Sequence, residues 1–243
     1  MNSATFAEKL LARKAGLSRV VAGQIVTVRP DKLLMHDNAA AIVTKVKTDI
    51  EQFGLCNPEL PVIVLDHVIP AADEKTATGH KLIRDFVERY RIPHFFDIGT
   101  GTCHQVMVEQ GFARPGRLVL GSDSHTCMYG ALGCFATGID RTEAAALLLT
   151  GETWLKVPTT IRIELRNQLP LMVSAKDLIL TVIGQIGADG ANYRAVEMHG
   201  QVSTIGLEER LTIANMGIEM GAKILVLLVD QVVRDYRERL GIA

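Results

Sequence analysis

The sequence predicts an α/β fold, because short apolar runs typical of buried strands alternate with amphipathic segments typical of helices. Pro61–Leu65 is an uninterrupted apolar run of the kind found in parallel strands that are covered on both faces. Asp73–Tyr90 carries apolar residues on one helical face. Of the 243 residues, 48% are hydrophobic and 22% are charged, so the chain can bury a sizeable core.

The other elements follow from apolar spacing and from stop and cap signals. Asn38–Phe53 has helical apolar spacing, and Gly54 follows it as a stop. Asp140 and Ser174 each precede an acidic residue by three positions, the capping-box pattern at a helix start. The further predicted elements are strands at 94–98, 117–120 and 160–165, and helices at 142–150, after Ser174, at 208–223 and at 230–240.

A change in composition near Lys156-Val157-Pro158 predicts a domain boundary close to residue 156. We therefore expect a first α/β domain over residues 1–156 and a second over residues 157–243. The second domain begins with a strand pattern and continues with helical ones, so it is also predicted to be α/β.

Charge and hydropathy exclude some classes of function. The formal net charge of -1 indicates neither a nucleic-acid-binding surface nor a disordered acidic tail. The aliphatic run Ile224–Val229 is too short to span a bilayer, and the N-terminal segment has no apolar signal core. We expect a cytoplasmic protein that binds neither nucleic acid nor membrane.

The four cysteines form no C-x-x-C pair, so their spacing does not indicate a zinc site. Disulfides are not expected in a cytosolic protein. We expect Cys56 and Cys134 to be small buried side chains. A purely structural interpretation is weaker for Cys103 and Cys127, because each neighbours a histidine or follows one closely.

Three predicted strands each deliver a histidine near their carboxyl ends, namely His67, His104 and His125. Ligands bind at the carboxyl ends of strands in open α/β sheets, so we expect these histidines to share one cleft. Asp66 and Asp123 stand next to them in sequence. A carboxylate beside an imidazole fixes its tautomer and raises its basicity, which makes a general acid or base for use near neutral pH.

Other interpretations of these motifs have less support. Gly99-Thr-Gly101 begins like a dinucleotide fingerprint, but His104 holds the place of the third glycine. Histidine and carboxylate also bind Zn or Fe(II), yet no H-E-x-x-H or similar helical spacing indicates a direct metal site. Any single motif could be an ordinary surface or capping sequence, but that interpretation weakens when three of them follow strand ends.

Asn215 and Glu219 are four residues apart and share one face of a predicted helix. Their apolar neighbours predict that Glu219 is partly buried and needs a partner, for which a histidine is a candidate. The remaining histidines are interpreted as structural or surface residues: His36, His80, His94 and His199. His36 fits that interpretation least well, because it opens a polar loop after Leu33-Leu34.

Five stretches carry a resemblance to a known family: LDHVIP, CHQVMVEQGFARPG, GSDSHTCMYGALGCFATG, GETWLKVP and TIANMGIEMGAK. They resemble the large subunits of 3-isopropylmalate dehydratases, within the aconitase superfamily, and they cover nearly the whole chain in the family's order. Homoaconitase and dimethylmalate dehydratase are near relatives. The resemblance implies an aconitase-type three-layer α/β domain followed by most of a second α/β domain.

The resemblance also implies a hydro-lyase that isomerises a hydroxy di- or tricarboxylate by dehydration and rehydration. The substrate expected first is 2-/3-isopropylmalate, in leucine biosynthesis, with homoaconitate, aconitate or dimethylmalate as alternatives. In the family, the first of three histidine–carboxylate pairs helps the substrate hydroxyl to leave as water. The implied pairs are His67 with Asp66, His104 with Asp123, and His125 with Glu219.

Three more residues match family positions near the substrate. Ser124 and Asn215 match positions close to the substrate and to the family's cofactor. His36 falls where aconitases carry a substrate-binding glutamine, so the resemblance implies a substrate contact there.

The implied cofactor is a [4Fe-4S] cluster with one iron that has no protein ligand and acts on the substrate hydroxyl and carboxylate. The family's cluster cysteines would lie beyond Ala243, and Ala214 stands where relatives often have a cysteine. Met128 and Asp140 also depart from the family pattern. The resemblance therefore implies a cluster whose cysteine ligands are not in this chain. It also implies two partners, a cluster-bearing C-terminal part and a small swivelling subunit.

Three interpretations stay open. The chain could be half of a split large subunit, inactive without a cluster-bearing part and a small subunit. It could be a truncated or repurposed, non-catalytic domain that binds a carboxylate or a partner protein. It could also be a fragment of a longer enzyme.

Overall fold

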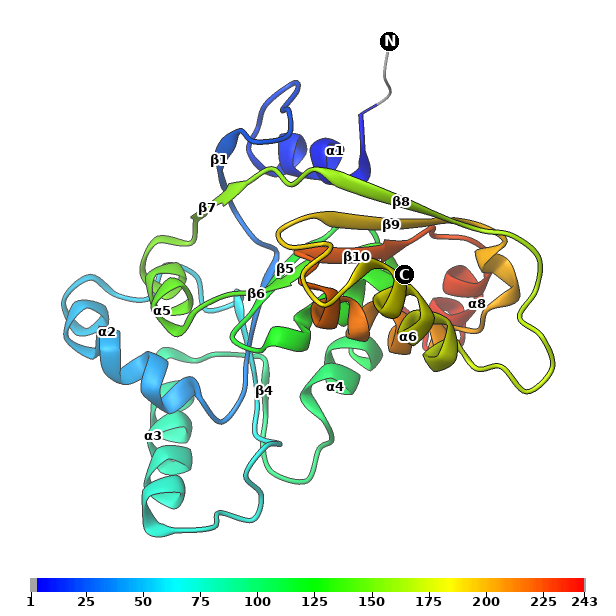
Figure 1. The fold of residues 1–243 in the computed structure, drawn as a ribbon. Coiled ribbons are helices and arrows are strands. Elements are labelled where there is room, and N and C mark those ends of the chain that lie inside the picture. Colours follow the sequence, from blue (N-terminus) through cyan, green and yellow to red (C-terminus); the bar gives the residue numbers. More distant parts are fainter. Residues whose placement is uncertain (1–3, 243) are drawn as a thin grey trace.

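The computed structural model of the chain describes residues 4–242 and confirms the α/β prediction (Figure 1). The strands are β1 (Ile25–Val28), β2 (Lys32–Met35), β3 (Pro61–Val64), β4 (Phe95–Phe96), β5 (Leu118–Gly121), β6 (Phe135–Gly138), β7 (Thr153–Lys156), β8 (Thr160–Leu165), β9 (Ala195–Gly200) and β10 (Ile224–Leu227). A parallel five-stranded sheet has the order β4-β3-β2-β5-β6, and a parallel three-stranded sheet has the order β10-β9-β8. A two-stranded antiparallel ribbon pairs β1 with β7.

Helices cover both sheets. The α-helices are α1 (Phe6–Lys14), α2 (Ala39–Phe53), α3 (Glu74–Tyr90), α4 (Cys103–Glu109), α5 (Arg141–Thr150), α6 (Ala175–Ile186), α7 (Leu207–Asn215) and α8 (Gln231–Arg239). The 3-10 helices are η1 (Ser124–Leu132), η2 (Val202–Thr204) and η3 (Met216–Met220). Within residues 4–242, no helix combines the length and the apolar character needed to cross a membrane.

Alternate side chains of the central strands enter two different apolar cores, because successive residues of a strand point to opposite faces. Leu33 and Met35 of β2 pack into a core formed with residues of α2, α3 and α5. Leu34 packs into a second core with α4, η1 and the three-stranded sheet. Figure 1 shows α2, α3 and α5 on one side of the central sheet and the β8–β10 sheet on the other.

The local helix signals are confirmed. Asp140 and Ser174 both form the predicted capping boxes, at the starts of α5 and α6. The strand predicted at 160–165 is β8 with the same bounds, and α2 ends at Phe53 before Gly54. Capping and apolar spacing are local properties, so the sequence alone is enough to read them.

Two predicted elements are wrong in extent. The helix expected over 208–223 ends at Asn215 and continues only as η3, because the chain must turn at Gly221 (φ 78°) to enter β10. The strand expected at 94–98 is reduced to β4, because the chain already turns at Asp97, whose carbonyl accepts the Thr100 N–H at 3.2 Å.

Two glycines of the stretch 121–138 allow close backbone approaches. A Cβ at Gly130 would lie 1.7 Å from the Leu225 carbonyl oxygen, so only glycine lets η1 pack directly on β10. A Cβ at Gly121 would lie 2.1 Å from Thr126 Oγ1, where the chain folds back after β5. The glycines therefore let the polar loop after β5 sit tightly between the two sheets.

The two sheets use separate parts of the chain, but the cores do not. All strands of the five-stranded sheet precede Lys156, and all strands of the three-stranded sheet follow it. One core nevertheless combines Leu34 and Val119 with Leu225. A boundary near residue 156, with domains at 1–156 and 157–243, remains a proposal about chain organisation.

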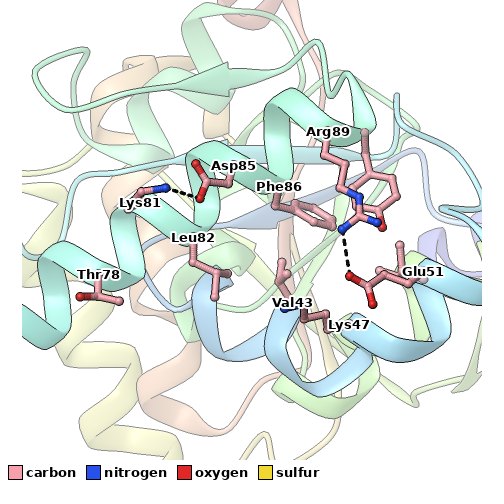
Figure 2. Close-up of a pocket in the computed structure, with 11 residues that line it drawn as sticks. Val43, Lys47, Glu51, Thr78, Lys81, Leu82, Asp85, Phe86 and Arg89 are labelled. Carbon is pink, nitrogen blue, oxygen red and sulfur yellow. Dashed lines mark hydrogen bonds and ion pairs between the residues drawn. The ribbon is translucent and has the colours of Figure 1, made fainter.

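α2 and α3 pack side by side, and a hollow of about 350 Å³ lies between them (Figure 2). Apolar side chains such as Val43, Leu82 and Phe86 line it, and the Arg89–Glu51 and Lys81–Asp85 ion pairs lie at its rim. None of its lining residues belongs to the histidine motifs. The predicted histidines therefore do not belong to this hollow; they follow the carboxyl ends of strands.

Candidate active site

The structure brings the three predicted histidines together around one carboxylate. Asp123, in the loop after β5, lies 3.6 Å from His67 Nε2, 3.0 Å from His104 Nε2 and 3.7 Å from His125 Nδ1. His67 follows β3, and His104 opens α4. Because parallel strands end at the same edge of a sheet, their loops converge there.

In the Asp66–His67 pair, the carboxylate is buried and the imidazole is partly exposed. His67 Nδ1 lies 2.6 Å from Asp66 Oδ1, and Asp66 Oδ2 accepts the Cys103 N–H at 2.6 Å. The Asp66 side chain is only 5% exposed, but that of His67 is 39% exposed. The carboxylate is therefore fixed by α4, while the imidazole is partly exposed and its Nε2 lies 3.6 Å from Asp123 Oδ2.

The two stacked imidazoles His36 and His67 have pKa values that move in opposite directions. Burial alone would lower the pKa of His67, but the hydrogen bond and charge of Asp66, with the charges of Asp123 and Asp37, raise it above its ordinary value. Burial and the nearby His67 lower the pKa of His36, whose ring lies 3.8 Å from that of His67. Within the stack, the environment therefore favours the protonated form of His67 and disfavours that of His36.

Asp123 is the ionised centre of the cluster. Burial would raise its pKa, but hydrogen bonds from the His104 side chain and the His125 N–H hold the pKa far below its usual range. Its Oδ1 accepts the His125 N–H at 2.7 Å, which also caps η1. One carboxylate thus lies close to all three histidines, whereas the family resemblance implies a pair with His104 alone.

His104 uses both ring nitrogens inside the protein. Its Nε2 lies 3.0 Å from Asp123, and its Nδ1 lies 2.7 Å from the hydroxyl of Tyr129. Tyr129 is fully buried, and burial raises its pKa well above the ordinary value, so its O–H stays protonated. The two contacts fit the tautomer in which Nε2 donates to Asp123 and Nδ1 accepts from the Tyr129 O–H.

The third pair is looser and more exposed. His125 Nε2 lies 3.9 Å from Glu219 Oε1, and His125 Nδ1 lies 3.3 Å from the Ser124 hydroxyl. The prediction that Glu219 is partly buried is wrong, because its side chain is 58% exposed. The reason is the early end of α7, which places Glu219 on η3 rather than on a continuous helix with Asn215.

Asn215 contacts Cys127, which is two residues after His125 in the chain. Its backbone carbonyl accepts the Cys127 thiol at 3.4 Å, and the residue lines another hollow with Gln105 and Met128. Across residues 4–242 it makes no hydrogen bond to any of the three clustered histidines. Hydrogen bonds, ion pairs or ring contacts join the other predicted site residues, and the role of Asn215 in substrate binding stays a prediction.

Sequence reasoning missed two contributors, Asp37 and Tyr129. Asp37 follows His36 directly in the polar loop after β2, which was the only signal for it. Tyr129 stands in the glycine-rich stretch, and its contact with His104 joins residues that are far apart in the chain. The structural interpretation of the other histidines agrees with their contacts: His80 bonds Asp37, His94 bonds Glu59, and His199 bonds Glu197.

A family model described as "Aconitase family (aconitate hydratase)" matches residues 8–241. The chain belongs to the aconitase family. It is 43% identical over 239 residues to 3-isopropylmalate dehydratase large subunit 1 of Methanopyrus kandleri, across 98% of this chain and 57% of that protein. It is 42% identical over 236 residues to the 3-isopropylmalate dehydratase large subunit of Aquifex aeolicus, across 96% of this chain and 54% of that protein. A probable methanogen homoaconitase large subunit of Methanothermobacter thermautotrophicus is 41% identical over 240 residues, across 96% of this chain and 56% of that protein.

The chain spans little more than half the length of these curated relatives. The aconitase family implies an iron–sulfur cluster, and cluster iron is held by cysteine thiolates. A fit therefore requires several cysteines that face one point and ionise readily.

The cysteines of this aconitase-family chain do not fit a cluster. Among the described residues, the only group of potential metal ligands that includes a cysteine is Cys103 with Asp66 and His67. Burial and the Asp66 charge raise the pKa of Cys103 well above its ordinary value, and burial raises the pKa of Cys127 and Cys134 to about 12. Cys56 is exposed, so the prediction that it is buried is wrong; it follows Gly54 in the loop between α2 and β3.

We expect the chain alone to remain without a cluster after anaerobic incubation with iron and sulfide, because no group of potential ligands in the described residues joins two cysteines, and burial raises the thiol pKa of Cys103, Cys127 and Cys134. The measurement is the visible absorbance and iron content of the desalted protein. A Cys103→Ala variant is the control for adventitious iron. A brown product whose absorbance disappears in that variant would contradict the expectation.

Proposed function

We propose that this chain is the histidine-bearing part of a hydro-lyase that isomerises a hydroxy di- or tricarboxylate by dehydration and rehydration. The observation that carries the proposal is the cluster of His67, His104 and His125, whose ring nitrogens all lie within 3.7 Å of the Asp123 carboxylate. Membership of the aconitase family supports the same reaction class. Such a site can both donate and accept protons near neutral pH.

Dehydration removes a proton from one carbon and a hydroxyl from its neighbour. In the proposed mechanism, cationic His67 gives its Nε2 proton to the departing hydroxyl, which leaves as water, while Asp66 stabilises the cation through Nδ1. Rehydration reverses the transfer at the neighbouring carbon. The group that takes the carbon-bound proton is proposed to come from a partner, the small swivelling subunit.

The remaining predicted residues would position substrate and protons. His104 is fixed between Asp123 and Tyr129, so we assign it an electrostatic role rather than direct transfer. His125, with Glu219, and the Ser124 hydroxyl lie on the exposed side of the cluster and would contact the substrate. Asn215 as a substrate-binding residue rests on the family resemblance alone.

His36 would be a substrate contact on the inner side of the cluster. Its Nδ1 is buried without a hydrogen-bond partner in the structure. An unpaired N–H buried at Nδ1 would cost more free energy than an unpaired lone pair there. The neutral ring would therefore carry its proton on Nε2. The Nε2–H could then donate to a substrate carboxylate.

For the substrate we propose 2-/3-isopropylmalate, in leucine biosynthesis, because relatives at 42–43% identity carry the 3-isopropylmalate dehydratase name. Homoaconitate is the first alternative, because a relative at 41% identity is named a homoaconitase large subunit. Aconitate and dimethylmalate follow. A cytoplasmic location goes with this biosynthetic role.

The proposed partners are a cluster-bearing C-terminal part and a small swivelling subunit. The cysteines of this chain do not fit a [4Fe-4S] cluster, so its ligands would have to come from the first of these partners. The second candidate function is a truncated or repurposed, non-catalytic domain that binds a carboxylate or a partner protein. The observation that favours it is the exposure of the Glu219 side chain, 58%, because a catalytic carboxylate is more often shielded from water.

The test combines this chain with a cluster-bearing C-terminal part and a small subunit of a homologous dehydratase. We expect no turnover from the chain alone and turnover of isopropylmalate by the mixture, followed by the absorbance of the unsaturated intermediate. Homoaconitate and citrate serve as competing substrates. If a mixture that forms a stable complex with its cluster turns over none of them, the non-catalytic function is favoured.

A further inference from the structure

Asp37 gathers four hydrogen-bond donors at the base of the histidine cluster. Its Oδ2 accepts the N–H groups of Asp66 at 3.1 Å and of His67 at 2.8 Å. Its Oδ1 accepts the Val68 N–H at 3.3 Å and lies 2.7 Å from His80 Nε2. Successive N–H groups that converge on one carboxylate form a concave anion site of the kind called a nest.

We propose that Asp37 and His80 form a positioning pair that holds the Asp66–His67 loop in its working geometry. The proposal rests on the proposed function of His67. Neither residue is assigned to touch the substrate: the side chains are only 9% exposed for Asp37 and 3% for His80. They act on the chemistry through the backbone of 66–68.

The loop of residues 66–68 depends on these contacts because it follows the end of a strand. It leaves β3 at Leu65, so its N–H groups no longer pair with a neighbouring strand, and the Asp37 carboxylate satisfies them instead. His80, on α3, ties the same carboxylate to the helix layer. Rotation of the peptide between Asp66 and His67 would separate Asp66 Oδ1 from His67 Nδ1, now 2.6 Å apart.

The charge on Asp37 is stabilised where it is needed. Burial would raise its pKa, but the N–H of His67, the His80 side chain and the N–H groups of Asp66 and Val68 lower the pKa below the ordinary value. The carboxylate is thus ionised at any pH at which His67 works. Its negative charge also raises the pKa of His67. A test must therefore separate the effect of Asp37 on the position of the 66–68 loop from the effect of its charge on His67.

The test is the NMR signal of the His67 Nδ1 proton in the 243-residue chain. This proton is protected from exchange with water only while it is bonded to Asp66, which makes the signal a probe of position rather than charge. We expect a protected, low-field resonance in the wild type. We expect it to be lost in His80→Leu and in Asp37→Asn, and kept in His80→Gln, which can still donate to Asp37.

Asp31→Asn is the matched control. Asp31 lies just before the other end of β2, where its carboxylate accepts the Leu118 N–H at 2.7 Å and pairs with Lys14 at 2.6 Å. This variant also removes one partly buried carboxylate charge beside the same strand, yet the His67 signal should persist. A protected signal in both His80→Leu and Asp37→Asn would overturn the proposal. If His80→Leu does not fold, the isosteric Asp37→Asn decides alone.

Turnover separates this proposal from the proposed function. In an active mixture, His80→Leu should lower kcat about 10²-fold with little change in KM, because a small displacement of a catalytic group has that effect, and His80→Gln should restore it. Loss of the NMR signal in a mixture that never turns over would refute the hydro-lyase function and leave the positioning pair standing. Unchanged kcat in an active mixture would refute the positioning pair alone.

Discussion

Replacing Asp66 by asparagine should lower kcat of the reconstituted enzyme about 10²–10⁴-fold, the usual contribution of a positioned acid or base. The carboxylate 2.6 Å from His67 Nδ1 is what favours the cationic imidazole. Without it, burial opposes the protonated imidazole and only the charges of Asp123 and Asp37 still favour it, so His67 binds the proton that the leaving hydroxyl needs less tightly. Initial rates at saturating substrate measure the effect.

The role of Asp66 also predicts how the rate depends on pH. Because the pKa of His67 is raised, the wild-type rate should fall as the pH rises through that value, above the ordinary value near 6.5. Asp66→Asn should shift this limb to lower pH, since the neutral amide no longer stabilises the cation. Asp73→Asn is the control, because Asp73 is an exposed cap of α3 that follows the same loop. An unshifted limb in Asp66→Asn would rule out His67 as the acid.

The parts of the site that are adjacent in sequence could be predicted. Asp66 with His67 is such a case, because β3 is an obvious apolar run and the pair follows it. The capping boxes at Asp140 and Ser174 are likewise complete within four residues. In each case one local pattern determines both the backbone conformation and the direction of the side chains.

The shared role of Asp123 could not be predicted in the same way. It depends on the distance between loops that follow different strands, and thus on how tightly the glycines let the loop after β5 fold back. The same holds for Tyr129, whose hydroxyl reaches His104 across 25 positions of the chain. Such contacts are set by sheet order, which the apolar pattern leaves open.

The error at Glu219 has an energetic origin. Helical spacing favoured one helix over 208–223, but packing of Gly217 against Leu225 and the turn at Gly221 favour the early end of α7. Tertiary packing outweighs helix propensity, which is worth less than about 1 kcal/mol per residue. A helix over 208–223 would place Glu219 among apolar neighbours, but the structure forms no such helix face at Glu219.

Arg210 is a buried charge that no sequence signal indicated. Its side chain is 0% exposed, and it makes a two-pronged ion pair with Asp230 at 2.9 and 2.7 Å. It also donates to the carbonyls of Ile205 and Val202. The pair joins α7 to the start of α8, where Asp230 is also the N-cap.

Asp230→Ala should therefore lower the free energy of unfolding by about 3–5 kcal/mol at pH 7, because it leaves the Arg210 charge buried and unpaired. Urea denaturation followed by circular dichroism measures the change. Burial would raise the pKa of Asp230, but Arg210 lowers it below the ordinary value. The stabilisation is therefore present above the unfolded pKa and is lost as the pH falls through the folded one.

Asp140→Ala is the control that separates the loss of a helix cap from the loss of the ion pair with Arg210. Asp140 is also an N-cap, at α5, but it is exposed and makes no ion pair with a buried arginine in the described part of the chain. Its removal should cost about 1 kcal/mol, the usual effect of losing a cap. The excess loss in Asp230→Ala then measures the unpaired Arg210. Equal losses in the two variants would mean that water or a neighbouring carbonyl solvates the guanidinium once Asp230 is gone, and that the buried pair adds nothing beyond its cap.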